Sequence, residues 1–255
     1  MPKQIKPQAL MKVHNVRKLH HSVCNAIIIE NKEPKGKTML ENIHVNWQSS
    51  ICIETSRAVI YLDPWQFTEE IHDADIICIS HSHHDHFSPE DIEKIAKEDT
   101  ILIAPESTEE EIAGKTGISR DNILFIRPGE QIHFGDLTIT GIPAYNVGKV
   151  FHKKEYGWLG FLVEADGTKY YYAGDTDVNE DIRKVKCDVA LVPIGGHYTM
   201  NAQEAADFIN EIAPEFVIPT HFGCVENAGS KNDDTNFLSR INENTNVILK
   251  LHKRG

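Results

Sequence analysis

The chain has 255 residues, of which 40% are hydrophobic and 25% are charged, an ordinary composition for a globular protein of one large domain or two small ones. Its formal net charge of −12 argues against nucleic acid or anionic membranes as partners, because polyanions are bound by clustered Lys and Arg. The five cysteines are scattered and no apolar run approaches the roughly 20 residues of a membrane span. We therefore expect reduced thiols, no membrane span and a cytoplasmic location.

Residues 1–38 differ from the rest of the chain in their charge. They hold eight Lys or Arg against two Glu, although the whole chain is acidic. We predict that 1–38 form a basic N-terminal extension, either mobile or contributing an added strand, and that 39–255 form the main domain. The sequence leaves these two forms of the extension open.

From about Glu41, short β-rich runs alternate with turns and helices. A helix is expected after Ser88, which can cap it, with Pro89 in the first turn. A second helix is expected from Asn201, which forms a capping box with Glu204, through Ile212. The predicted strands cover 50–54, 58–62, 75–80, 101–104, 137–142, 160–164, 169–173, 188–192 and 216–219.

The run from His81 to His86 (His-Ser-His-His-Asp-His) directly follows the expected strand 75–80 and directly precedes the helix capped by Ser88. A turn between two rigid elements holds its side chains firmly. Imidazoles and a carboxylate are the ligands that zinc prefers, and so many histidines would be costly to bury without a partner. The run therefore predicts a metal site.

Two more potential ligands follow apolar strands elsewhere in the chain. Asp175 comes after the strand 169–173, with Gly174 allowing close backbone approach. His221 comes after the strand 216–219. Each signal is weak alone, but all three segments place ligand atoms at the end of a short strand, which strengthens the prediction of one shared site.

With these motifs the chain resembles the metallo-β-lactamase-fold superfamily of metal-dependent hydrolases, from about Glu41 to His221. The run 81–86 matches its signature motif, 174–176 its bridging aspartate and 219–221 its last histidine. Asp63-Pro64-Trp65 is similar to another segment of this fold, and 193–200 looks like the branch related to ascorbate-phosphate lactonases. The resemblance implies an α+β fold, a four-layer αββα sandwich over 39–255, with the metals at one edge.

The resemblance also implies two divalent metal ions, with zinc expected first and manganese or iron as alternatives. His84 falls on a variable position of the motif and is interpreted as a neighbour of the site. The implied ligands are His81 and His83 for the first metal, Asp85, His86 and His221 for the second, and Asp175 between both.

The chain departs from the family pattern in two places. The third histidine of the first metal is expected near 143–146, where Asn146 stands. His152 on a nearby loop is favoured over Asn146 as its substitute, and His133 is less favoured because it alternates with apolar neighbours as a strand residue does. The second departure is Gln48, near which relatives often carry a histidine.

These features predict an enzyme that hydrolyses a small ester, lactone or phosphoester with a metal-bound hydroxide. Asp85 is expected to orient the nucleophile or accept its proton. His197, Tyr198 and Asn146 are expected to contact a small-molecule substrate, although 195–199 also fits a plain surface turn. One alternative is a phosphodiesterase acting on nucleic acid or phospholipid headgroups, for which 1–38 would supply positive charge. The other is a metal-binding module without enzymatic activity, and a homo-oligomer is compatible with the sequence.

Overall fold

The computed structural model describes residues 27–29, 40–223 and 233–250. The predicted basic extension over 1–38 lies outside these residues except for the short strand β1 (Ile27–Ile29), so the predicted boundary near residue 39 stays a prediction. None of the helices in the described part of the chain is long and apolar enough to cross a membrane.

The described strands form two sheets, one of six strands in the order β2-β3-β4-β5-β6-β7 and one of eight in the order β1-β14-β13-β12-β11-β10-β9-β8. The first sheet contains β2 (Ile43–Trp47), β3 (Ser50–Glu54), β4 (Val59–Leu62), β5 (Ala74–Cys78), β6 (Ala96–Pro105) and β7 (Ile123–Ile126). The second contains, besides β1, β8 (Gln131–Phe134), β9 (Leu137–Pro143), β10 (Leu159–Ala165), β11 (Thr168–Tyr172), β12 (Val189–Pro193), β13 (Phe216–Thr220) and β14 (Asn246–Leu249). The helices are α2 (Pro89–Ile95), α3 (Glu109–Ile112), α4 (Ala202–Ile212) and α5 (Asp233–Leu238), with 3₁₀ turns η2 (Glu106–Thr108), η3 (Arg120–Asn122), η4 (Lys154–Tyr156) and η5 (Ile182–Lys184).

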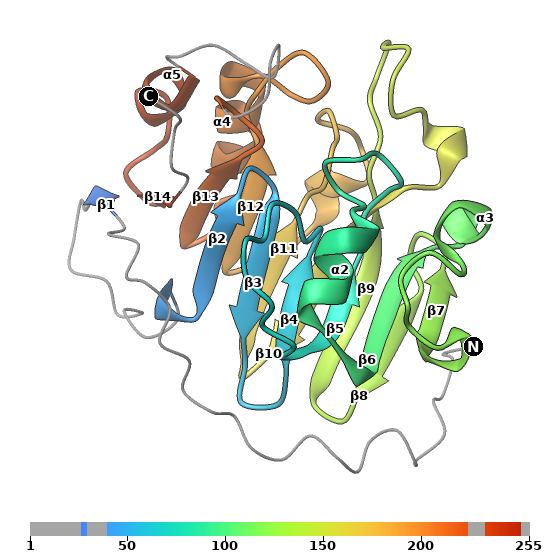
Figure 1. Cartoon of the computed structure of the whole chain (residues 1–255). Helices are drawn as coiled ribbons and strands as arrows, with labels where there is room; N and C mark the ends of the chain where they lie inside the picture. The colour runs from blue at the N-terminus through green and yellow to red at the C-terminus, as the bar shows by residue number, and fades with distance from the viewer. Residues whose placement is uncertain (1–26, 30–39, 224–232, 251–255) are drawn as a thin grey trace.

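Three apolar clusters show how the layers stack. The largest lies between the two sheets and joins Ile60 and Leu62 of the first to Phe161 and Leu191 of the second. A second cluster packs α4 and α5 on the other face of the eight-stranded sheet, and a third packs α2 on the outer face of the six-stranded sheet. The predicted four-layer αββα sandwich is therefore confirmed, and Figure 1 shows α2 in front of β4 to β6 with α4 and α5 on the far side.

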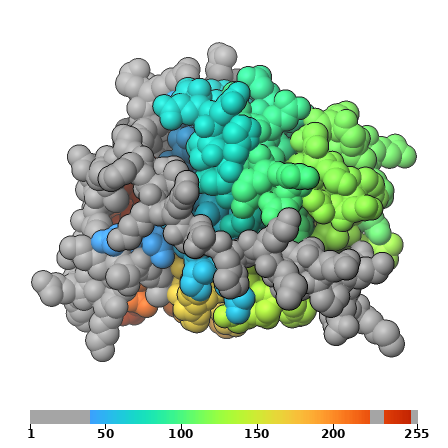
Figure 2. Space-filling view, turned by 60° about the horizontal axis from the view of Figure 1, so that its bottom comes forward, coloured from blue at the N-terminus to red at the C-terminus, as the bar shows by residue number. Residues whose placement is uncertain are grey.

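The two halves of the chain build the two sides of this sandwich. In Figure 2, which looks toward the bottom of Figure 1, cyan and green segments of the six-stranded half spread across the surface, with yellow and orange segments of the other half below them. Burial on both faces explains why strands such as β4 and β12 are continuous apolar runs.

Both predicted helix starts are confirmed in their capping chemistry. Ser88 accepts a hydrogen bond from the backbone N–H of Asp91 at the start of α2. Asn201 and Glu204 form a complete capping box at the start of α4. The Ser88 cap, two residues after His86, fixes the start of α2 and so fixes the end of the segment 81–86.

The topology brings the predicted ligand loops to one edge. β11, β12 and β13 are parallel, and β9 runs in the same direction because both β9 and β11 are antiparallel to β10. The loops after β9, β11 and β13 therefore leave the eight-stranded sheet at the same end. The loop after β5 of the six-stranded sheet lies at this end as well (Figure 1).

Candidate metal centre

The turn after β5 is short and internally bonded. The backbone N–H groups of His86 and Phe87 both donate to the carbonyl of His83, at 3.0 and 2.7 Å. This bend buries His81 and His86 and leaves His83 at the surface. The three imidazoles are thus held on one side of a turn whose two ends are fixed by β5 and α2.

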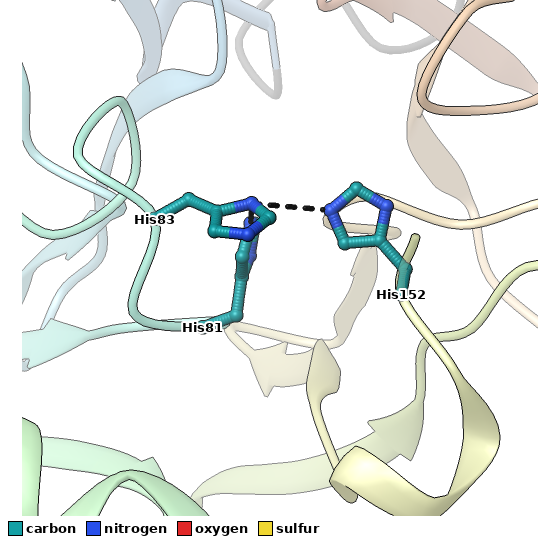
Figure 3. Close-up of side chains that lie close together, drawn as sticks. All are labelled: His81, His83 and His152. Carbon is teal, nitrogen blue, oxygen red and sulfur yellow. Dashed lines mark hydrogen bonds between the residues drawn. The ribbon is translucent and has the colours of Figure 1, made fainter. Parts of the chain in front are cut away.

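A first cluster is formed by His81, His83 and His152 (Figure 3). His83 Nδ1 lies 3.1 Å from His81 Nε2 and 3.3 Å from His152 Nε2. Two nitrogens bound to one tetrahedral zinc ion at their usual distances would be about 3.3 Å apart. The spacing of the three nitrogens therefore fits a shared cation.

His152 lies in the loop between β9 and β10, and its ring is oriented by a carbonyl of the loop between β12 and α4. Its Nδ1 donates to the carbonyl of Tyr198 at 3.0 Å, so the neutral ring presents an unprotonated Nε2 to His83. Asn146 instead donates its amide to the same carbonyl, at 2.6 Å. Of the two residues weighed for this position, the structure brings His152 to His81 and His83 and places Asn146 behind it.

A second cluster contains Asp85, His86 and His221. Asp175 lies between the two clusters: its Oδ1 is 3.3 Å from His86 Nε2, and its Oδ2 is 3.3 Å from His221 Nε2 and 3.5 Å from His152 Nε2. The buried atoms His86 Nε2, His221 Nε2 and Asp175 Oδ1 have no hydrogen-bond partner within the described residues. Such orphaned donors and acceptors are rare in native proteins, and their convergence fits a cation.

Asp85 is held from outside the motif. Gln48 donates its side-chain amide to Asp85 Oδ2 at 3.0 Å, and the same oxygen lies 3.6 Å from His221 Nε2. Gln48, near which relatives often carry a histidine, thus supplies a donor to the proposed catalytic carboxylate.

The charges of the two clusters differ. Burial lowers the pKa of His81 and His152, and partial desolvation lowers that of the more exposed His83, so these imidazoles are neutral, as metal ligation requires. Burial also disfavours a charged His221, but Asp175 and Asp85 outweigh it and raise its pKa to about 9.

Attraction to the imidazoles also lowers the pKa of Asp85 in the second cluster and of Asp175 beside it. Burial alone would raise the pKa of Asp175 and Asp85, yet the neighbouring His221 and His86 hold both well below the usual range. A concentration of fixed negative charge that stabilises protons on buried imidazoles would equally stabilise a divalent cation in their place.

The remaining predicted residues lie around the clusters. His84 is exposed, with its Nδ1 3.9 Å from Asp85 Oδ1, and is in none of the clusters of described residues that could hold a metal. His197 is exposed and Tyr198 half-buried beside the loop that carries His152. His133 lies in β8, where its neighbours alternate in burial.

Several residues that contact the ligands were not identified from the sequence as part of the site. Asp63 is fully buried and accepts hydrogen bonds from Ser80, Tyr172 and His86 Nδ1. Trp158 packs its ring 4.7 Å from that of His81. The available signal for Asp63 was a carboxylate directly after an apolar strand, the same placement that identified Asp175.

Comparison with known proteins gives one matching family model, the beta-lactamase superfamily domain, over residues 43–221. A UPF0173 metal-dependent hydrolase from Aeropyrum pernix is 32% identical over 196 residues, which cover 67% of this chain and 78% of that protein. A solved structure from Parabacteroides distasonis is 26% identical with a TM-score of 0.67, covering 82% of this chain and 93% of that one. The metallo hydrolase Igni18 from Ignicoccus hospitalis shares the fold at 20% identity, with a TM-score of 0.64 and coverage of 84% and 95%.

Proposed function

The chain belongs to the beta-lactamase superfamily, and from this membership and the convergence of its strand-end ligands we propose that it is a metal-dependent hydrolase acting on a small ester, lactone or phosphoester. The observation that carries the proposal is the meeting of four loops at one edge, where His83 faces His152 and Asp175 lies between two imidazole clusters.

The proposed cofactor is a pair of divalent cations. His81, His83 and His152 would hold one and Asp85, His86 and His221 the other, with Asp175 between them. Imidazole with carboxylate favours zinc over magnesium or calcium, which take oxygen ligands. When bound, the cations supply Lewis acidity, polarising the scissile oxygen and lowering the pKa of water toward neutrality.

The protein's own groups orient this chemistry. Asp63 accepts a hydrogen bond from Nδ1–H of His86, and the Tyr198 carbonyl accepts one from Nδ1–H of His152, so that the unprotonated Nε2 of each ring faces the site. Asp85, kept ionised by its low pKa and held by Gln48, can accept a hydrogen bond from an attacking water and fix its direction.

A metal-counting experiment tests the cofactor. Full-length protein dialysed against zinc, manganese or iron should retain two equivalents of the preferred ion by mass spectrometry of the metal. His83→Ala should lower the first-site affinity, whereas His84→Ala, a matched change at an exposed neighbour, should not. Folded protein that retains less than one equivalent of each ion would refute the proposal.

A turnover experiment tests the activity. 4-Nitrophenyl acetate, a γ-lactone, 4-nitrophenyl phosphate and bis(4-nitrophenyl) phosphate represent the candidate classes and the phosphodiesterase alternative. Asp85→Asn should keep the fold and lower kcat by about 10²- to 10⁴-fold, the range for loss of a positioned acid–base group. No turnover of any substrate by the metal-loaded protein would support a metal-binding module instead.

A further inference from the structure

Exposed large hydrophobic side chains are concentrated in one short segment. Within the described residues they are Val147, Val150, Phe151 and Tyr156, exposed by 59%, 72%, 39% and 37%. All belong to 147–156, which we call the apolar rim. Large apolar side chains left exposed in one segment are candidates for contact with a ligand or partner.

The apolar rim adjoins the metal centre. Phe151 directly precedes His152, and its ring lies 5.0 Å from that of Tyr198, whose carbonyl orients His152. At the other end, the ring of Tyr156 lies 5.0 Å from that of Trp158, which packs 4.9 Å from the ring of His83. Both ends of the apolar rim are therefore linked to the metal-facing histidines, one through ring contacts to His83 and the other through Tyr198, whose carbonyl bonds His152.

Polar contacts hold the backbone of this segment in place. The backbone N–H of Asn146 donates to the carbonyl of His152 at 2.7 Å. Lys149 donates to Asp177 at 2.6 Å and to the carbonyl of Thr199 at 2.7 Å. A surface fixed before binding loses less conformational entropy when a ligand covers it.

The lysines of the apolar rim are neutralised by acidic partners. Lys149 pairs with Asp177, and Lys154 pairs with Asp181 at 2.9 Å. Lys153 lies 3.8 Å from Glu155. The segment thus offers a substrate apolar contact rather than unpaired positive charge, which favours an uncharged group over a phosphate-bearing one.

We propose that the apolar rim binds an aliphatic or aromatic acyl group, so that the preferred substrates are esters or lactones with a sizeable apolar portion. This rests on the hydrolase proposed above and specifies its substrate class. Since burying one methylene group favours binding by about three- to fourfold, selectivity should rise steeply with acyl length until the apolar rim is covered.

The first test compares 4-nitrophenyl acetate, butyrate and octanoate with the metal-loaded, full-length protein. The octanoate-to-acetate ratio of kcat/KM should exceed about tenfold and arise mainly from KM. Phe151→Ser should lower this ratio about tenfold, whereas Phe151→Leu, which keeps an apolar side chain, should retain it. Metal content is measured in both variants, and a ratio unchanged by Phe151→Ser at full metal content would overturn the proposal.

The second test needs no turnover. Acetohydroxamate and octanohydroxamate carry the same metal-chelating group, so calorimetry on the metal-loaded protein isolates the contribution of the chain. Octanohydroxamate should bind at least tenfold more tightly, and Phe151→Ser should remove that difference. If octanohydroxamate binds more tightly and Phe151→Ser removes the difference, yet no ester is hydrolysed, the apolar rim binds acyl groups and the hydrolase proposal fails.

Two outcomes would overturn the apolar rim as an acyl site. One is equal affinity for the two hydroxamates. The other is a dimer in size-exclusion chromatography that Phe151→Ser converts to monomer, because a second copy of the chain would then cover the segment.

Discussion

The carboxylate of Asp63 shows how one residue sets the geometry of another. It is fully buried and accepts hydrogen bonds from the Ser80 N–H at 2.7 Å, the Tyr172 hydroxyl at 2.6 Å and His86 Nδ1 at 2.6 Å. A buried carboxylate is tolerated only when donors surround it. Its bond to His86 leaves Nε2 directed at Asp175.

The Tyr172 hydroxyl offers a test of this arrangement. Tyr172→Phe removes one donor to Asp63, and we expect zinc affinity to fall by about tenfold, as for other groups that orient metal ligands. Tyr171→Phe is the matched control, because the neighbouring Tyr171 hydroxyl is also buried but has no hydrogen-bond partner in the described structure. Competition with a fluorescent zinc chelator measures both, and equal losses would show that Asp63 does not need this donor.

Backbone conformation is a second residue-scale feature of the site. Gln48, Asp63, His152 and His221 all have positive φ, between 46° and 50°. Residues other than glycine rarely adopt a positive φ, and backbone strain of this kind is common at functional sites. Gly174 also has a positive φ, and a Cβ there would lie 2.9 Å from the Leu159 carbonyl, which explains why glycine precedes Asp175.

At the scale of elements, the loop between β9 and β10 is joined to the loop between β12 and α4. Lys149 of the first loop donates to the carbonyls of Gly196 and Thr199 in the second loop, and also to Asp177, which follows β11. The second loop also carries the Tyr198 carbonyl that orients His152. The position of His152 therefore depends on the Lys149 hydrogen bonds that join the two loops.

Lys149→Met should remove the hydrogen bonds that join the two loops while keeping the alkyl portion of the side chain. We expect a several-fold loss of zinc affinity at the first site with only a small change in thermal stability, since no core residue is altered. Lys154→Met, at the more exposed pair with Asp181, is the control and should change neither. Calorimetric titration with zinc compares the variants, and wild-type affinity in Lys149→Met would contradict this role.

Elements with strong local signals were predicted well, and some strands without such a signal were not predicted. The strand predicted over 50–54 and the helix from the Asn201 capping box to Ile212 agree with β3 and α4. The strands β2, β7, β8 and β14 were not predicted, because the formation of a strand depends on its neighbours in the sheet as well as on its own sequence.

At the scale of the whole molecule, the proposed metal ligands come from both sheets. His81 follows β5 of the six-stranded sheet, while Asp175 and His221 follow strands of the eight-stranded one. Cations bound by all three would link the two layers, so binding should stabilise the native state by mass action.

Metal removal should therefore lower the thermal midpoint by several degrees, as measured by calorimetry with and without chelator. The difference should grow with pH. His221 has a pKa of about 9 in the metal-free protein against an ordinary 6.5, so its protonated form stabilises the metal-free fold below about pH 6.5, and this is lost as pH rises through 9. Over the same interval protons compete less with zinc. A zinc-induced shift that is constant from pH 6.5 to 9 would contradict this coupling.

The sequence by itself determined the superfamily, the layered fold and most of the proposed ligands, because the run 81–86 lies in a single turn and the other two ligands follow recognisable strands. Tertiary structure decided what depends on distant segments meeting. His152 and His83 are 69 residues apart, and only the packing of both sheets brings them together and places Asn146 behind. The hydrogen bond from Tyr172 to Asp63 spans 109 residues. Such contacts leave no local pattern, since the partners become neighbours only when the two sheets close over their shared core.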